Sequence, residues 1–193
     1  MVNQNIISEL IGILGQEKVI LDPAELRLKS RDALEMSRAF NAAHNLDKTA
    51  DVLIKPNETM EISAVLRVAN KFKVPVIPLG GRSGVMGGLV PMYGGILLDL
   101  SELNKLLSIN VQDRTVTVES GMLLGALKTK LESFDLILGH DPWSVPIATI
   151  GGAISTNGIG YRASVTGSMG SQVLGMKIVL PTGDILTTRA VAI

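Results

Sequence analysis

The strongest constraint on the fold of this chain is a glycine-rich loop that follows a short apolar segment. Residues 78–88 read Pro-Leu-Gly-Gly-Arg-Ser-Gly-Val-Met-Gly-Gly. Glycine has no Cβ and tolerates positive φ, so such a loop can turn consecutive N–H groups inward around an anion. Residues 74–78 predict a strand just before it, and ligands tend to bind where strands of open α/β sheets end. The sequence therefore predicts a phosphate-binding loop, with a flexible hairpin loop as the alternative.

The loop matches neither of the two common nucleotide-binding motifs. It lacks the G-x-G-x-x-G pattern that precedes a crossover helix, and it lacks the Gly-Lys-Ser/Thr ending of a P-loop. Both of the corresponding folds are therefore disfavoured.

A second segment, residues 141–160, combines small side chains with hydrogen-bonding groups. A loop stiffened by Pro142 and Pro146 runs into a predicted short helix. Small residues at the start of this helix leave room for a flat ligand against the backbone, while hydroxyl and amide groups can bind it. The alternative is a small-residue helix packed tightly against a sheet. The residues concerned are Ala148, Thr149, Gly151, Gly152, Ala153, Ser155 and Asn157.

At these two segments the sequence resembles the FAD-binding domain of the vanillyl-alcohol-oxidase (PCMH-type) flavoproteins. This group includes glycolate oxidase subunits, D-lactate dehydrogenases and alkylglycerone-phosphate synthase. The resemblance runs from about residue 22 to residue 188, and the order and spacing of several motifs carry it. These motifs are residues 30–32, 80–88, 95–100, 148–152 and 174–183. The resemblance implies an α+β fold, the PCMH-type FAD-binding fold of two α/β subdomains with the flavin between them.

The resemblance also implies which residues contact FAD. The first loop would bind the diphosphate through its backbone, with the Ser83 hydroxyl as a further donor. Its residues are Gly80, Gly81, Arg82, Ser83, Gly84 and Gly87. The second segment would run along the diphosphate and ribityl chain toward the isoalloxazine. Its residues are Pro142, Ser144, Ala148, Thr149, Gly151, Gly152, Ser155 and Asn157.

The flavin is expected to be noncovalent. The chain has no cysteine, and Arg82 stands where relatives with a histidyl-linked flavin carry histidine and where glycine is commoner. Whether the Arg82 guanidinium pairs with phosphate or covers the edge of the loop stays open. No metal is expected, because cysteine is absent and the only histidines are His44 and His140.

Composition excludes several classes of protein. Of 193 residues 46% are hydrophobic, and 18 basic residues balance 18 acidic ones, which predicts a globular domain and no nucleic-acid partner. No apolar run approaches the roughly 20 residues that span a bilayer, and the N-terminus lacks a signal-peptide pattern. The chain is therefore expected to be soluble and cytoplasmic.

Hydrophobic periodicity predicts the arrangement of elements. Residues 51–56 and 74–78 read as parallel strands joined by a helix, whereas 96–99, 107–111 and 116–118 read as antiparallel neighbours. A helix with Leu124, Leu127, Leu131 and Phe134 on one face follows, and a hairpin turns at residues 181–183. We expect a smaller subdomain at 1–88 and a larger, apparently truncated one at 89–193, with the family's cap or substrate domain absent.

The resemblance implies a flavin-dependent oxidoreductase, or its FAD-binding subunit, that oxidises a 2-hydroxy acid such as glycolate or D-lactate by hydride transfer to flavin N5. No residue is identified as the catalytic base, and the chain alone is expected to be inactive without a cap domain or second subunit. Three alternatives stay open: an alkylglycerone-phosphate synthase-like enzyme, a flavin-binding or interface module without activity, and the reductase that makes UDP-N-acetylmuramate.

Two further features of the sequence have no settled role. His140 can face the flavin or substrate, or it can be satisfied by local backbone. Tyr161 and Arg162 can reach a substrate carboxylate or phosphate, because arginine binds both in a bidentate manner, or they can lie on the surface. His44 is expected on the surface.

Overall fold

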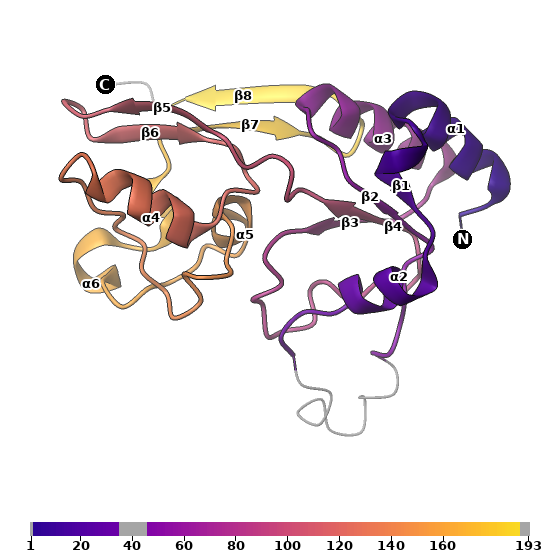
Figure 1. Ribbon diagram of the computed structural model, residues 1–193, viewed down its shortest axis with the longest axis horizontal. Coiled ribbons are helices and arrows are strands. Elements are labelled where there is room, and N and C mark those ends of the chain that lie inside the picture. Colours follow the sequence, from indigo (N-terminus) through magenta and orange to yellow (C-terminus); the bar gives the residue numbers. More distant parts are fainter. Residues whose placement is uncertain (1, 35–45, 190–193) are drawn as a thin grey trace. The chain divides into compact units, whose positions relative to one another are not determined.

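The structure of the protein is a computed structural model that describes residues 2–34 and 46–189. The chain forms two compact units (Figure 1). The first comprises residues up to 102 together with 177–186, and the second comprises 103–176 with the residues from 187 onward. The boundary between these compact units lies after residue 102, because the strand at 96–99 pairs within the sheet of the first unit.

The first unit is built on a four-stranded sheet in the order β1-β2-β4-β3. Its strands are β1 (Val19–Ile20), β2 (Val52–Ile54), β3 (Val76–Leu79) and β4 (Ile96–Asp99). β4 runs parallel to both β2 and β3, and β1 pairs antiparallel at the edge. The expected antiparallel role of residues 96–99 is therefore wrong, and so is direct pairing of the two earlier strands. A strand buried on both faces, as β4 is, belongs in the middle of a parallel sheet.

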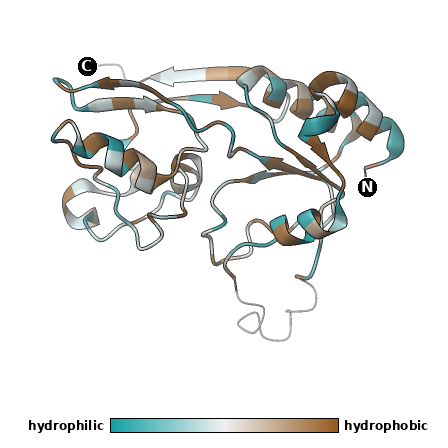
Figure 2. Ribbon diagram, in the orientation of Figure 1, coloured by the Kyte–Doolittle hydropathy of each residue, from teal (hydrophilic) through white to brown (hydrophobic). Residues whose placement is uncertain are grey.

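Helices cover both faces of this sheet (Figure 1). α1 (Gln4–Leu14) and α3 (Thr59–Phe72) pack on one face, and α2 (Pro23–Lys29) lies on the other. Alternate residues of β2 and β4 pack into the hydrophobic cores on the two faces of the sheet. Ile54 and Leu98 face α1 and α3. Leu53 and Leu97 pack with Leu26 of α2. Figure 2 shows the resulting hydrophobic colour along the strands.

Local signals determine the helix ends. The Asn3 side chain accepts a hydrogen bond from Ile6 N at the start of α1, and Asp22 does the same for Glu25 N in α2. α1 ends at Gly15, where φ is 88°, and a short 3-10 turn, η1 (Gln16–Lys18), leads into β1.

The second unit holds the hairpin of β5 (Leu106–Asn110) and β6 (Thr115–Val118), as the sequence predicts. Its helical elements are α4 (Leu124–Glu132), α5 (Ile150–Ser155), α6 (Ala163–Thr166) and η3 (Met169–Gln172). A register irregularity after Leu106 places Leu106 and Ile109 against the core and leaves Leu107 and Val111 exposed.

β7 (Gly175–Val179) and β8 (Ile185–Arg189) form the predicted C-terminal hairpin, and the boundary between the units passes through both strands. Its turn belongs to the first unit, where the Ser63 hydroxyl of α3 donates to the Gly183 carbonyl. Among the described residues, no helix is both long and apolar enough to cross a bilayer.

Candidate functional site

The glycine-rich loop leaves β3 at Leu79 and stays largely exposed until Leu89. Within residues 2–34 and 46–189, none of the backbone N–H groups from Gly80 to Gly88 donates a hydrogen bond to a protein acceptor. Two carbonyls of the loop are engaged, because Gly84 O accepts from Ala33 N at 2.8 Å and Gly87 O accepts from Val90 N at 3.1 Å. Within the part of the chain that the structure describes, the loop is thus anchored by its carbonyls while its donors have no acceptor, which is the arrangement that an anion requires.

Glycines in the loop differ in what surrounds them. A Cβ at Gly84 would lie 3.7 Å from Asp32 Oδ2, an ordinary contact, and a Cβ at Gly88 would meet nothing within 4 Å. Gly87 has a φ of 74°, and its Cβ would lie 3.3 Å from Leu34 Cδ2. Gly84 and Gly88 are therefore free of packing demands, whereas Gly87 is required by its backbone conformation.

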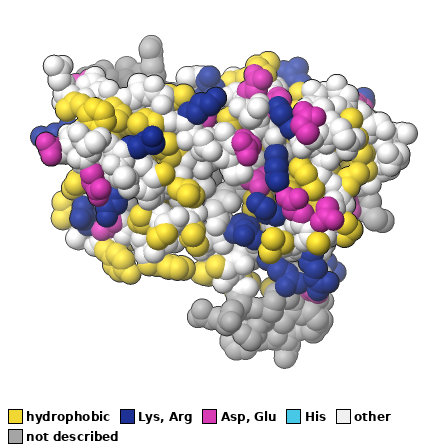
Figure 3. All heavy atoms as spheres, viewed as in Figure 1, with side chains coloured by type: hydrophobic (Ala, Val, Ile, Leu, Met, Phe, Trp, Pro, Cys, Tyr) yellow, Lys and Arg dark blue, Asp and Glu magenta, His cyan; other side chains and the backbone are white. Residues whose placement is uncertain are grey.

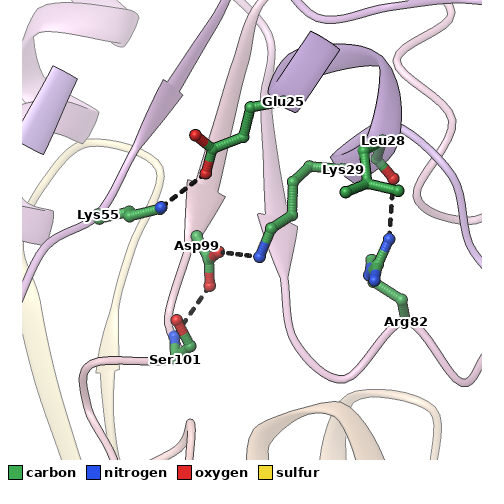
Figure 4. A network of polar contacts seen from close by, with 7 residues as sticks. All are labelled: Glu25, Leu28, Lys29, Lys55, Arg82, Asp99 and Ser101. Carbon is green, nitrogen blue, oxygen red and sulfur yellow. Dashed lines mark hydrogen bonds and ion pairs between the residues drawn. The ribbon is translucent and has the colours of Figure 1, made fainter. Parts of the chain in front are cut away.

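Arg82 lies at the edge of this loop with a φ of 55°. Its Nη1 donates to the carbonyl of Leu28 at 2.8 Å, near the end of α2 (Figure 4). The next residue, Lys29, places Nζ 3.0 Å from Oδ2 of Asp99, which is 1% exposed. Lys55 and Glu25 form a neighbouring ion pair at 2.7 Å.

A pocket of about 90 Å³ adjoins the loop. Its lining residues are Arg31, Asp32, Leu34, Leu46 and Val90. Leu34 and Val90 also lie closest to the space in front of Gly87.

Thr149 begins the second segment's helix as its N-cap. Its side chain is buried and accepts from Gly152 N at 3.2 Å. Gly151 N donates to Ser120 O at 2.7 Å, and a Cβ at Gly151 would lie 2.8 Å from Ser120 Cβ. Close packing against Ser120 therefore requires glycine at 151. The N–H of Gly151 is occupied, so its remaining contribution to a ligand is the absence of a side chain.

The other predicted residues of this segment hold its own backbone. Ser144 O accepts from Ala148 N at 2.8 Å, and Pro142 O accepts from Val145 N at 3.1 Å. Ser155 Oγ donates to Gly151 O at 2.8 Å. Asn157, with a φ of 48°, accepts from Gly170 N at 3.0 Å. The fourteen-residue site predicted from the sequence is thus divided: the residues from 80 to 87 belong to the first unit and those from 142 to 157 to the second.

His140 is 3% exposed, and its Nδ1 has no hydrogen-bond partner among the described residues. The ring lies against Gly158, whose Cβ would come within 3.1 Å of both Cε1 and Nε2. Burial lowers the pKa of His140, and the neighbouring Asp141 carboxylate partly opposes this. The expected satisfaction of this histidine by local backbone is not found for Nδ1. His44 lies outside the described residues.

Asp141 holds the turn that contains Arg162. Its Oδ1 accepts from Arg162 N at 2.8 Å, and its Oδ2 lies 3.3 Å from Arg162 Nε. Tyr161 is 80% exposed, and Trp143 and Val165 of the same unit are also exposed. Figure 3 shows that hydrophobic side chains reach the molecular surface at several places. Among the described residues, no cluster of three or more histidine, aspartate or glutamate side chains could hold a metal ion.

Sequence reasoning missed the groups that anchor both segments: Ser120, Lys29, Asp99 and the carbonyl of Leu28. Only Asp99 carried a local signal, as a carboxylate at the end of the apolar run Ile-Leu-Leu. The others act through a backbone carbonyl or across a long sequence separation.

Comparison with known proteins places this geometry in a family. The model of the FAD binding domain family matches residues 50–189. D-lactate dehydrogenase of Anaerostipes hadrus is 38% identical over 140 residues, which are 72% of this chain and 29% of that protein. Glycolate oxidase subunit GlcD of Bacillus subtilis is 30% identical over 188 residues, 97% of this chain and 38% of that protein. The chain thus spans about a third of the length of these relatives.

The fold agrees with a solved structure. Alkyldihydroxyacetonephosphate synthase superposes with a TM-score of 0.84 and 22% identity, covering 98% of this chain and 38% of that one. This similarity confirms the expected α+β, PCMH-type fold. Because the family match covers most of the chain and includes both predicted segments, the protein belongs to the FAD-binding domain family of flavoproteins.

Proposed function

We propose that this chain binds FAD noncovalently and forms the flavin-binding part of an oxidoreductase that oxidises a 2-hydroxy acid. FAD supplies the hydride acceptor when bound, and the chain binds and orients it. The family match and the names of the relatives D-lactate dehydrogenase and glycolate oxidase subunit support the proposal.

The observation that carries the FAD site is the run of N–H groups from Gly80 to Gly87 that find no acceptor among the described residues. A diphosphate presents several oxygens that accept such bonds, and charge-assisted hydrogen bonds are among the stronger ones. Gly80, Gly81, Arg82, Ser83, Gly84 and Gly87 would bind the diphosphate, all but Ser83 through the backbone alone. The loop suits this group, because its N–H groups have no protein acceptor among the described residues and five of its residues are glycines.

The second segment would meet the rest of the cofactor through its small residues. Thr149, Gly151 and Gly152 begin a helix whose first N–H groups already donate to Met122 O, Ser120 O and Thr149 Oγ1, so this part offers an accessible backbone surface more than free donors. Ser144 and Asn157 retain side-chain donors for the ribityl chain or diphosphate. Pro142, Ala148 and Ser155 complete the assigned set.

The residues at the site support noncovalent binding. The sequence has no cysteine, and Arg82 cannot form the histidyl linkage. A base for the substrate hydroxyl and a cation for its carboxylate are proposed to come from a cap domain or a second subunit.

FAD binding tests the loop assignment. Purified protein mixed with FAD and freed of excess cofactor should retain about one flavin per chain and release it on denaturation. Gly84→Val should weaken FAD binding at least about tenfold while the midpoint of urea unfolding stays unchanged, because the added side chain meets no tight contact. Gly88→Val is the matched control, since its Cβ also meets open space. Equal affinity in the two variants would refute the assignment of the diphosphate to this loop.

The substrate class is tested separately, with this chain supplied together with its cap domain or partner subunit. Anaerobic addition of D-lactate or glycolate should bleach the bound flavin. Bound flavin that neither acid reduces would refute the 2-hydroxy-acid assignment and leave FAD binding in place.

A further inference from the structure

The glycine-rich loop is attached to the end of α2 and to the segment that follows it. Gly84 O accepts from Ala33 N at 2.8 Å, and Arg82 Nη1 donates to Leu28 O at 2.8 Å. Both contacts cross about fifty residues of sequence, and both leave the N–H groups of the loop unused. The conformation of the loop therefore depends on where α2 ends.

Arg82 is suited to this contact by its chemistry. The last four carbonyls of a helix lack intrahelical partners, and cations near a helix C-terminus interact favourably with the helix dipole. Leu28 is the penultimate residue of α2, so its carbonyl is one of these groups. The guanidinium of Arg82 thus satisfies an orphan acceptor and places a positive charge at the negative end of the helix.

The helix end is itself held in place. Lys29 Nζ lies 3.0 Å from Oδ2 of the buried Asp99, which ends β4 (Figure 4). The next residue, Ser30, is fully buried, and its Oγ accepts from Ala50 N at 3.0 Å. These contacts hold the end of α2 in place, and Arg82 attaches the loop to it.

The backbone conformation of Arg82 supports a structural role for its side chain. A non-glycine residue with a φ of 55° carries a steric penalty that glycine avoids. Glycine would be unstrained at this position but has no side chain. Arginine carries the steric penalty and supplies a guanidinium that binds the carbonyl of Leu28.

We propose that Arg82 is a positioning residue: its side chain caps α2 and preorganises the glycine-rich loop for the diphosphate, and its guanidinium is not a phosphate ligand. The proposal rests on the proposed function, because the diphosphate is the ligand assigned there. It predicts that Arg82 acts on the loop before any cofactor is present.

The first test is hydrogen exchange of the Ala33 amide in the cofactor-free protein, since this N–H reports on the contact with Gly84. Arg82→Gly should exchange it about tenfold faster, even though glycine relieves the strain at φ 55°. Lys29→Met, which loosens the end of α2 without touching the loop, should act in the same direction. Arg27→Ala is the control, because it removes an exposed cation of the same helix and should leave this amide unchanged.

The second test is the salt dependence of FAD affinity. If Arg82 is a positioning residue, Arg82→Gly should raise the FAD dissociation constant about tenfold. The factor should be the same at low and at high salt. A direct guanidinium–phosphate contact would instead give a loss that shrinks as salt is raised, because screening weakens the contact in the parent protein.

The outcomes separate the two proposals. Unchanged Ala33 exchange in Arg82→Gly, or a salt-dependent loss of affinity, would overturn the positioning role. Failure of the parent protein to bind FAD would refute the proposed function, while the exchange measurement would still decide whether Arg82 anchors the loop.

Discussion

Lys29 Nζ lies 3.0 Å from Oδ2 of Asp99, so an ion pair joins the last residue of α2 to the last residue of β4. Asp99 is 1% exposed, and its second oxygen accepts from Ser101 N at 3.0 Å. The Lys29 side chain keeps 27% of its surface exposed. A buried carboxylate is thereby paired on one side and bonded to backbone on the other, which is how such a charge is tolerated inside a protein.

Asp99→Ala should destabilise the fold by about 2 kcal/mol. Removing one partner of a fully buried pair costs about 3–5 kcal/mol, and partial exposure of Lys29 lets water recover some of that loss. The free energy of unfolding in urea measures the effect. Glu25→Ala is the control, because its pair with Lys55 is about one-third exposed on each side and should contribute below about 1 kcal/mol. Equal losses in the two variants would contradict this account.

Gly151→Ala should lower the free energy of unfolding by about 1–3 kcal/mol. Its Cβ would lie 2.8 Å from Ser120 Cβ and 3.0 Å from Ser120 O, and backbone cannot yield as a flexible side chain can. The clash should outweigh the better helix propensity of alanine in α5. Gly12→Ala in α1 isolates that propensity, because its Cβ meets nothing within 4 Å, and it should stabilise the protein by about 0.5–1 kcal/mol. A stabilising Gly151→Ala would show that the helix can move away from Ser120.

Gly183→Ala should destabilise the turn between β7 and β8 and its attachment to α3. The φ of 85° is strained for alanine, and the Cβ would lie 2.3 Å from Arg67 Cγ and 2.7 Å from the Ser63 carbonyl oxygen. We expect a loss of about 1–3 kcal/mol in thermal or urea unfolding. Ser63→Ala removes only the hydroxyl that donates to Gly183 O and should cost less, about 1 kcal/mol.

Stability should fall as the pH drops below about 6.5, the ordinary pKa of histidine. Burial lowers the pKa of His140 in the folded state, with Asp141 opposing, so the unfolded chain binds more protons below that pH. Unfolding midpoints between pH 7.5 and 5.5 should therefore decline for the parent protein and decline less for His140→Gln. The pKa of Glu61 is also lowered in the folded state, although burial alone would raise it. Glu61 therefore makes stability depend on pH only below its usual pKa of 4.5. Parallel curves for the parent and His140→Gln would contradict the assignment of this window to His140.

Local elements were predictable where a short stretch of sequence is sufficient to determine them. α4 follows from Leu124, Leu127 and Leu131 at helical spacing, all three buried, and the β5–β6 hairpin follows from alternation around a turn. The glycine-rich loop was predicted as an anion site because glycine composition alone permits that backbone, and this stays a prediction; among the described residues its N–H groups have no protein acceptor. The register irregularity after Leu106 was not predictable, since a single extra residue changes which side chains face the core.

By itself, the sequence determined the family, the two glycine-containing segments and the local elements around them, because these depend on residues close together in the chain. Only the tertiary structure decided that β4 lies between β2 and β3, that Ser120 requires glycine at 151, and that Arg82 reaches α2. Each of these depends on contacts between distant parts of the chain, several of them with backbone carbonyls. A carbonyl is present at every residue, so no sequence pattern marks which one a side chain will bind.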